Sequence, residues 1–383
     1  MLHYLDNAAT TFPKPVSVYQ EVYRCMSKYC GNPGRGSHRL SLEASRAIFE
    51  CRSLIADLVG VSELDRIVFT YNTTYALNMV IKGVLKKGDH VIISDMEHNA
   101  VLRPIWKLAQ NDIISYDVFS TMLGEDRKSP TLICAKIASL IKPNTKMVIC
   151  SQASNICSAT LPIKEIGEFC QRHSLFLLVD GAQSVGHHDI DVDHMNIGAL
   201  CFPSHKGLYG PQGCGVIALG KNVYMDTLFE GGNGINSLDG NMPPMPPERY
   251  EAGTLATPAI AGLAQGVRAI LSTPKGEILE YQKQLFSIAY SYLSNIDGIT
   301  VYAPQYKGPV LLFNTDGRTS EYTAQLLDSY GICTRGGFHC SALAHKTLGT
   351  PDGGAVRISF GMFNKKKDID ALAKALVQIK KQI

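Results

Sequence analysis

Apolar side chains recur along residues 41–219 at two alternating spacings, one typical of helices and one typical of strands. The series begins with a helical face in residues 41–59, made by Ala44, Ile48, Cys51, Ile55 and Leu58. Short runs rich in Val, Ile and Leu predict strands at residues 66–70, 90–94, 113–118, 147–151, 175–180, 199–202 and 215–219. Helices are predicted between them at residues 73–87, 100–110, 130–141 and 163–173. This alternation predicts an α/β fold, in which helices cover a mainly parallel sheet of the seven-stranded type.

The pattern changes after two stretches rich in Gly and Pro, residues 231–234 and 241–247, which predict loops. Beyond a helix that begins near Pro258, two helices lead to the next strands. The strands of this part are predicted at residues 299–302, 309–315 and 356–360, and a last helix closes the chain. We therefore expect a smaller α+β domain at the C-terminal end.

The composition is that of a folded protein, with 45% hydrophobic and 19% charged residues. A length of 383 residues suggests two domains, and the net charge of +3 gives no sign of a nucleic-acid partner. No apolar run reaches the ~18–20 residues that a membrane-spanning helix needs. The N-terminal residues lack the basic and apolar segments of a signal peptide, so we expect a cytoplasmic protein with no membrane partner.

The 11 cysteines include no Cys-x-x-Cys pair, which argues against a disulfide framework and against a structural zinc site. We expect most of them, such as Cys51 and Cys150, to be buried thiols. A cysteine with a chemical role must therefore be identified from the residues around it.

The strongest chemical signal is a carboxylate and a lysine that follow two strands. Asp180 ends the strand at residues 175–180, and Lys206 follows the strand at residues 199–202. Pyridoxal phosphate (PLP) requires such a pair, a carboxylate for its pyridinium nitrogen and an amine for its imine. Asp180 alone could be a helix cap and Lys206 alone a surface lysine. Their combination with Gln183 and His205 favours a PLP site.

At this point the sequence resembles the class V aminotransferase superfamily of PLP enzymes, and within it the cysteine desulfurase and selenocysteine lyase branch with a short catalytic loop. The resemblance begins at Tyr4-Leu-Asp-Asn-Ala-Ala9, reaches Val356-Arg-Ile-Ser-Phe360 and covers nearly the whole chain. It implies the fold-type I architecture of PLP-dependent transferases. The expected parts are an N-terminal arm (1–14) that packs with the small domain, a large PLP-binding domain (15–260) and a small C-terminal domain (261–383) that carries the loop of Cys340.

The resemblance implies which residues bind the cofactor phosphate. Thr73 and Thr74 follow a strand and open a helix, where free amides and the helix dipole favour an anion, although a simple helix cap is the alternative. Ser204 and His205 are implied as further ligands. Thr254 is implied to reach the phosphate of a neighbouring subunit, so we expect a homodimer.

The resemblance also assigns roles around the cofactor ring. His98 is expected to stack on the ring and to act in catalysis, and Asp180 to pair with the pyridinium nitrogen. Gln183 is expected to donate to the ring hydroxyl, and Asn155 to lie near that hydroxyl and the substrate carboxylate. Lys206 is the expected imine lysine.

Substrate binding is implied for a set of cationic and polar residues. Arg357 matches the arginine that clamps the substrate carboxylate, a task for which a bidentate guanidinium suits better than lysine. A salt bridge at a strand edge is the alternative role for Arg357. Arg335, Arg35 and His38 are implied as further substrate-binding residues, together with Asn155.

The segment Thr334-Arg-Gly-Gly-Phe-His-Cys340 resembles the loop that carries a persulfide-forming cysteine. Two glycines permit a tight turn, and Arg335 and His339 are expected to favour the thiolate of Cys340. A buried structural cysteine is the alternative.

The implied reaction converts L-cysteine to L-alanine and leaves a persulfide on Cys340, for a sulfur-acceptor protein such as those of iron–sulfur cluster assembly. A selenocysteine lyase acting on L-selenocysteine, a sulfinate-cleaving relative, and a noncatalytic PLP-binding partner of sulfur carriers remain alternatives.

Four positions depart from the family pattern and leave the substrate preference open. Pro203 stands where the family has the serine of Ser-x-His-Lys, Ser158 replaces a glycine, and Asn72 and Tyr75 replace the glycine and the glutamate of Gly-Thr-Thr-Glu. The His- and Asp-rich stretch at residues 186–192 matches a family loop, so we expect no metal there.

Overall fold

The structure is a computed structural model that describes residues 2–34, 36–121, 129–350 and 352–381. Its centre is a sheet of seven strands, in the spatial order β2 (Ile67–Thr70), β8 (Gly215–Leu219), β7 (Ala199–Pro203), β6 (Phe176–Asp180), β5 (Thr145–Ser151), β3 (His90–Ser94) and β4 (Ser115–Phe119). β8 runs antiparallel to both of its neighbours, and the other strand pairs are parallel. The predicted mainly parallel seven-stranded sheet is therefore confirmed.

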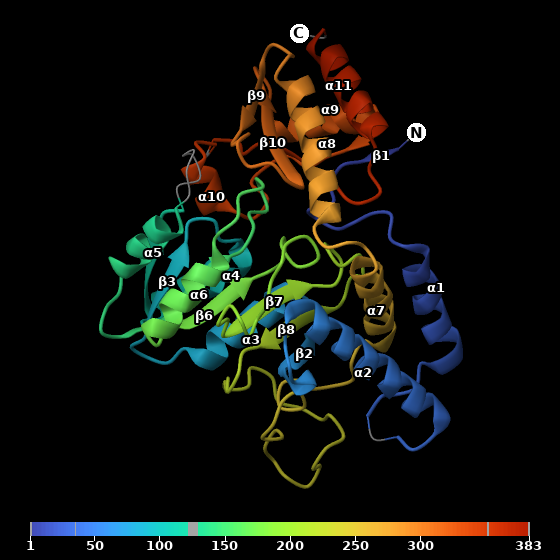
Figure 1. Ribbon diagram of the computed structural model, residues 1–383, viewed down its shortest axis with the longest axis vertical. Coiled ribbons are helices and arrows are strands. Elements are labelled where there is room, and N and C mark those ends of the chain that lie inside the picture. Colours follow the sequence, from blue (N-terminus) through green and yellow to red (C-terminus); the bar gives the residue numbers. More distant parts are fainter. Residues whose placement is uncertain (1, 35, 122–128, 351, 382–383) are drawn as a thin grey trace.

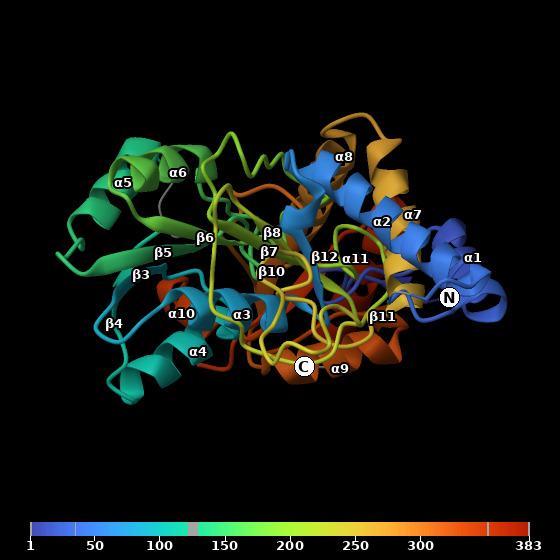
Figure 2. The ribbon, with the colours of Figure 1, turned by 90° about the horizontal axis from the view of Figure 1, so that it is seen from below.

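Helices cover both faces of this sheet (Figure 2). One face packs against α2 (Arg39–Val59), α5 (Pro130–Ala138), α6 (Ile163–Arg172) and α7 (Thr257–Leu271). The other face packs against α3 (Thr73–Val84) and α4 (Asn99–Gln110). Side chains alternate along a strand, so in β7 Leu200 and Phe202 join the first layer while Ala199 and Cys201 join the second.

The remaining helices of this part are α1 (Val16–Arg24), a π-helical turn (Cys25–Tyr29) and a 3₁₀ turn (Leu64–Arg66). α1 packs on α7, which also packs on α2. α7 thus continues through residue 260, the predicted domain boundary, without a break. The boundaries at residues 14 and 260 stay a prediction.

The C-terminal part forms a second layer above the large sheet (Figure 1). Its antiparallel sheet has the order β12 (Val356–Ser359), β10 (Val310–Thr315) and β9 (Ile299–Tyr302). The accompanying helices are α8 (Glu277–Leu293), α9 (Ser320–Ser329), α10 (Ala342–Thr347) and α11 (Lys366–Lys380). The core here contains Phe286, Phe313, Ile358 and Leu372.

The N-terminal residues also lie in this second layer. β1 (His3–Tyr4) pairs in parallel with β11 (Ile332–Cys333), and a further bridge joins Asp6 to Ser359. Residues from the two ends of the chain therefore lie side by side next to the Cys340 loop.

The predicted helix at residues 73–87 ends earlier, at Val84, because Leu85 takes an extended conformation with φ −78° and ψ 141°. The helix predicted to reach residue 141 likewise ends at Ala138. Within the described residues, no helix is long and apolar enough to cross a membrane.

Candidate active site

One cavity of about 260 Å³ lies where β5, β6 and β7 end and where α3 and α4 begin. The parallel register places Ser151 beside Asp180, and Asp180 beside Cys201, so these strands end at one edge of the sheet. Most of the predicted cofactor-binding residues line this cavity: Thr73, Thr74, His98, Asn155, Asp180, Gln183, His205 and Lys206. The fold thus brings together residues that are spread over more than a hundred positions.

Lys206 and Asp180 form a pair of opposite charges in this cavity. Burial lowers the pKa of Lys206 to about 8, an effect that the Asp180 charge opposes and that Arg357 and Arg335 reinforce. Burial raises the pKa of Asp180, against the effects of the Ala182 amide and of Lys206. The Ala182 N–H donates to Asp180 Oδ1 at 2.9 Å and fixes the carboxyl. A lysine with this pKa is partly neutral near pH 8, as a nucleophilic or basic amine must be.

Part of the cavity lining has the properties of an anion site. α3 begins here, with Asn72 as its N-cap accepting from the Tyr75 N–H at 3.1 Å. Thr73 Oγ1 and His205 Nδ1 are buried and have no hydrogen-bond partner among the described residues. Buried polar atoms of this kind need a ligand, and a phosphate at a helix N-terminus supplies one. The residues present therefore fit the phosphate of PLP.

His98 is the N-cap of α4, and its Nδ1 accepts from the Ala100 N–H at 3.0 Å. Burial, with the charges of Lys206, Arg357 and Arg103, lowers the pKa of His98 to about 4. The ring is therefore neutral at pH 7 and carries its proton on Nε2. A neutral ring is suited to stacking on a cofactor ring and can still exchange a proton at Nε2.

The N-terminal arm contacts two residues that line the cavity, Gln183 and His205. Gln183 Nε2 donates to the Ala8 carbonyl at 2.9 Å, which uses one N–H of the amide that was predicted to bind the ring hydroxyl. The Thr11 N–H and hydroxyl both donate to the His205 carbonyl, at 3.0 and 3.1 Å. The arm thereby fixes the turn that carries Lys206.

Arg357 lies beside the cavity in β12, 3% exposed, and is held by two contacts. Its Nη2 donates to Asp6 Oδ1 and its Nη1 to the Asn155 carbonyl, both at 2.9 Å. Its Nε is buried with no partner in the described part of the chain. Arg335, half-exposed, donates to Asp6 Oδ2 at 2.9 Å. A substrate carboxylate could satisfy the Nε of Arg357.

Cys340 is exposed, and hydrogen bonds from Asn99 and Asn155 hold its loop. The Asn99 N–H donates to the Cys340 carbonyl at 2.7 Å, and Asn155 Nδ2 donates to the His339 carbonyl at 2.8 Å. Burial lowers the pKa of His339 to about 3, so this ring is neutral and adds no positive charge beside the Cys340 thiol. The expectation that a positive charge on His339 favours the thiolate of Cys340 was therefore wrong.

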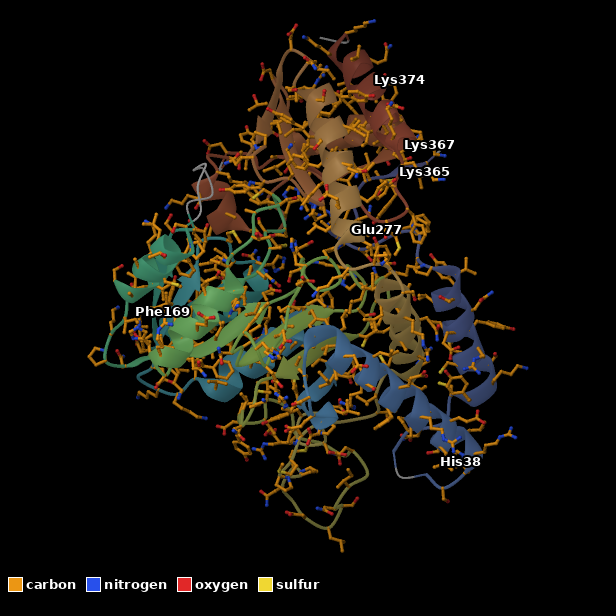
Figure 3. The ribbon with its side chains drawn as sticks, in the orientation of Figure 1. His38, Phe169, Glu277, Lys365, Lys367 and Lys374 are labelled. Atoms are coloured by element: carbon orange, nitrogen blue, oxygen red, sulfur yellow. The ribbon has the colours of Figure 1, made fainter. Side chains whose placement is uncertain are left out.

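Several predicted residues lie outside the cavity. His38 is exposed at the N-cap of α2 and, as Figure 3 shows, lies at the edge of the molecule rather than beside the central sheet. Arg35 lies outside the described residues. Ser204 is fully buried and does not line the cavity. Thr254 lines a different cavity of about 420 Å³, together with Tyr75.

Three residues with clear contacts to the site were not predicted. Asp6 belongs to the Tyr4–Ala9 motif, and its place in that motif was the available signal. Glu97 precedes His98 and accepts from the Ser151 N–H at 2.7 Å; burial, with the nearby Asp180, raises its pKa to about 8. Ser341 follows Cys340 and is fully buried, and no local sequence pattern predicted this burial.

Known proteins are similar to this chain in both sequence and fold. The sequence model of the family described as Aminotransferase class-V matches residues 3–372. A probable cysteine desulfurase of Halalkalibacterium halodurans is 31% identical over 389 residues, which cover 99% of this chain and 93% of that protein. A cysteine desulfurase of Yersinia pestis is 31% identical over 391 residues, covering 99% of this chain and 94% of its own length.

Solved structures agree with these relatives. The apo cysteine desulfurase of Thermococcus onnurineus superposes with a TM-score of 0.89 at 28% identity, over 100% of this chain and 95% of that one. A cysteine desulfurase of Escherichia coli gives a TM-score of 0.86 at 25% identity, with 100% and 95% covered. These matches confirm the expected fold class. The chain therefore belongs to the aminotransferase class-V family, whose members use PLP, and is homologous to cysteine desulfurases.

Proposed function

We propose that this protein is a PLP-dependent cysteine desulfurase that converts L-cysteine to L-alanine and forms a persulfide on Cys340. The observation that carries the proposal is the role of Asn155, whose side chain lines the cavity of Lys206 and Asp180 and also holds the Cys340 loop. Through Asn155, the loop that carries the exposed Cys340 thiol contacts the cavity that contains the Lys206 amine and the Asp180 carboxyl.

The cofactor would be held at both ends. Thr73, Thr74 and His205 would bind its phosphate, and Asp180 would pair with its ring nitrogen. Lys206 would link to its aldehyde. When bound, PLP withdraws electrons from the substrate carbon atoms so that bonds at those atoms can break.

The protein residues supply orientation and proton transfer. Arg357, through its Nε edge, and Asn155 would hold the substrate carboxylate. The Lys206 Nζ, neutral in a large fraction of molecules near pH 8, would move the proton of the substrate Cα. His98 is neutral and would exchange a proton at Nε2.

Cys340 would receive the sulfur. Its thiolate forms an S–S bond with the substrate sulfur while the carbon–sulfur bond breaks, and the carbon product takes up a proton to become alanine. The persulfide then lies on an exposed residue. Exposure suits transfer to a sulfur-acceptor protein, which we propose as the physiological partner.

The deciding experiment measures alanine released from L-cysteine, L-selenocysteine and cysteine sulfinate by the purified PLP-loaded protein. Multiple turnovers with cysteine in the presence of a thiol reductant are expected. Release from selenocysteine alone would make the protein a selenocysteine lyase. No alanine from any of the three would leave the noncatalytic alternative.

A further inference from the structure

One amide side chain that lines the cavity, that of Asn155, contacts the Cys340 loop twice. Asn155 Nδ2 donates to the His339 carbonyl at 2.8 Å, and the Ser341 hydroxyl donates to Asn155 Oδ1 at 2.6 Å. Both contacts flank Cys340, one residue on each side. Asn155 is 8% exposed and Ser341 is fully buried, so water competes little for either bond.

The chemistry of the groups fixes the orientation of this amide. A carbonyl oxygen only accepts, so the nitrogen of Asn155 must face His339 and its oxygen must face Ser341. Ser341 is therefore the donor. Among the contacts of the described residues, the loop takes one of the two N–H groups of Asn155. The other N–H remains for a ligand in the cavity that Asn155 lines.

The loop needs such a support because its backbone is strained. His339 and Cys340 have φ values of 50° and 56°, in the left-handed region that residues with a Cβ seldom adopt. Conformations of this kind persist only where surrounding contacts hold them. Cys340 itself is exposed, so packing against Cys340 contributes little to holding this conformation.

The His339 ring also holds the loop, through hydrogen bonds to Arg335 and His345. Its Nε2 must donate to the Arg335 carbonyl, at 3.1 Å, which leaves Nδ1 to accept from His345 Nε2 at 3.2 Å. His345 Nδ1 then accepts from the Thr350 hydroxyl at 2.8 Å. Both rings are neutral, because burial lowers the pKa of His339 to about 3 and of His345 to about 4. Both ring nitrogens of His339 are therefore engaged, so the loop is joined to the cavity by Asn155, which contacts both Ser341 and His339, and by the Asn99 N–H, which donates to the Cys340 carbonyl.

We propose that Ser341 is a positioning residue, which orients the Asn155 amide so that a bound substrate carboxylate and the Cys340 thiol keep a fixed relation to each other. This deepens the proposed function and rests on it. Losing the hydroxyl releases Oδ1, lets the amide rotate and removes one of the bonds that hold the strained loop. The step that suffers is transfer of sulfur to Cys340, and cofactor binding is spared.

The test compares Ser341→Ala with Thr323→Val, a matched loss of one buried hydroxyl. Thr323 is fully buried and bonds to Thr315 at 2.7 Å in the small domain. We expect Ser341→Ala to lower kcat for alanine release from cysteine about tenfold. Release from selenocysteine should fall less than about twofold, because the weaker carbon–selenium bond depends less on the nucleophile. Thr323→Val should change neither rate. Equal losses on both substrates, or none, would overturn the proposal.

A second measurement does not depend on turnover. Iodoacetamide alkylation of Cys340 is followed by mass spectrometry, with the other exposed cysteine, Cys30, as the reference in the same sample. The ratio of the two rates should change at least about threefold in Ser341→Ala. Asn155→Asp, which keeps the acceptor for Ser341 but loses the donor to His339, should shift the ratio in the same direction. An unchanged ratio in both variants would refute the support role even if the protein desulfurates cysteine. Failure of the parent to release alanine would instead refute the proposed function.

Discussion

Asp6 Oδ1 accepts a hydrogen bond from Arg357 Nη2 at 2.9 Å, although 351 positions separate the two residues along the chain. The other oxygen of the same carboxylate accepts from Arg335. One carboxylate of the N-terminal arm thus bridges two guanidinium groups that repel each other, and it holds Arg357 at the cavity. Burial lowers the pKa of Arg357, and Asp6 opposes that effect.

Replacing Arg357 with lysine should raise the KM for cysteine about 10- to 100-fold, or about 1.4–2.7 kcal/mol, because lysine cannot bind a carboxylate with two N–H groups in a fixed fork. Steady-state kinetics of alanine release give the answer, and the cofactor absorbance should be unchanged. Arg335→Lys is the control, since Arg335 is half-exposed. A larger effect at Arg335 would transfer the carboxylate role to that residue.

Lys206→Ala should abolish both the visible absorbance of the linked cofactor and all turnover, because no other described residue presents an amine in the cavity. The measurement is a visible spectrum after incubation with PLP and gel filtration. Lys221→Ala, at an exposed lysine, should keep the colour and the activity of the parent. A yellow Lys206→Ala protein with the parent spectrum would rule out the assignment.

The rate at which the apo protein links PLP should rise with pH and level off above a midpoint near 8. The neutral amine is the reacting form, and burial lowers the pKa of Lys206 from its ordinary 10.5 to about 8. Stopped-flow absorbance between pH 6.5 and 10 measures this profile.

Lys14 must be excluded as the source of this midpoint, because burial also lowers the pKa of Lys14 to about 8. Lys14→Gln should keep the same midpoint. A rate still rising through pH 10 in the parent would show that Lys206 has an ordinary pKa.

Cys340→Ala should bind PLP normally but release alanine from cysteine at least ~100-fold more slowly, with partial activity on selenocysteine. Because Cys340 is exposed, its truncation should change the free energy of unfolding by less than about 0.5 kcal/mol. Cys30→Ala, at the other exposed thiol, should behave as the parent. Parent-like desulfuration by Cys340→Ala would redirect the search to Cys157 and Cys333, which neighbour the proposed site in sequence. Cys333 would be tested first, because it is partly exposed and Cys157 is buried.

Thr254 lines a separate cavity of its own chain, which agrees with the expectation that it reaches the cofactor phosphate of a second subunit. We therefore expect a homodimer by light scattering, and a weaker affinity for PLP, by about threefold or more, in Thr254→Val. Thr227→Val removes an exposed hydroxyl and serves as the control. A fully active monomer would remove Thr254 from the site.

Strand–helix alternation was enough to predict the large sheet, because its strands are apolar runs and its helices have a regular apolar face. The residues after each strand were also predictable as site residues, since parallel strands end at a common edge. β1 and β11 were not predicted, because two residues are too few to show the alternation of apolar and polar side chains that identifies a strand. His38 was assigned to the substrate by resemblance, yet it caps α2 at the edge of the molecule.

The order of residues along the chain sets the chemistry that the site offers: a lysine, a carboxylate, a helix N-terminus for an anion and a cysteine in a Gly-Gly turn. How these groups are tuned and joined depends on the packing of the folded chain. Burial sets the pKa of Lys206 and makes His339 neutral, and burial depends on every element packed around a residue. The Asp6–Arg357 and Ser341–Asn155 contacts join segments that are distant in sequence, and no local pattern encodes such a distance.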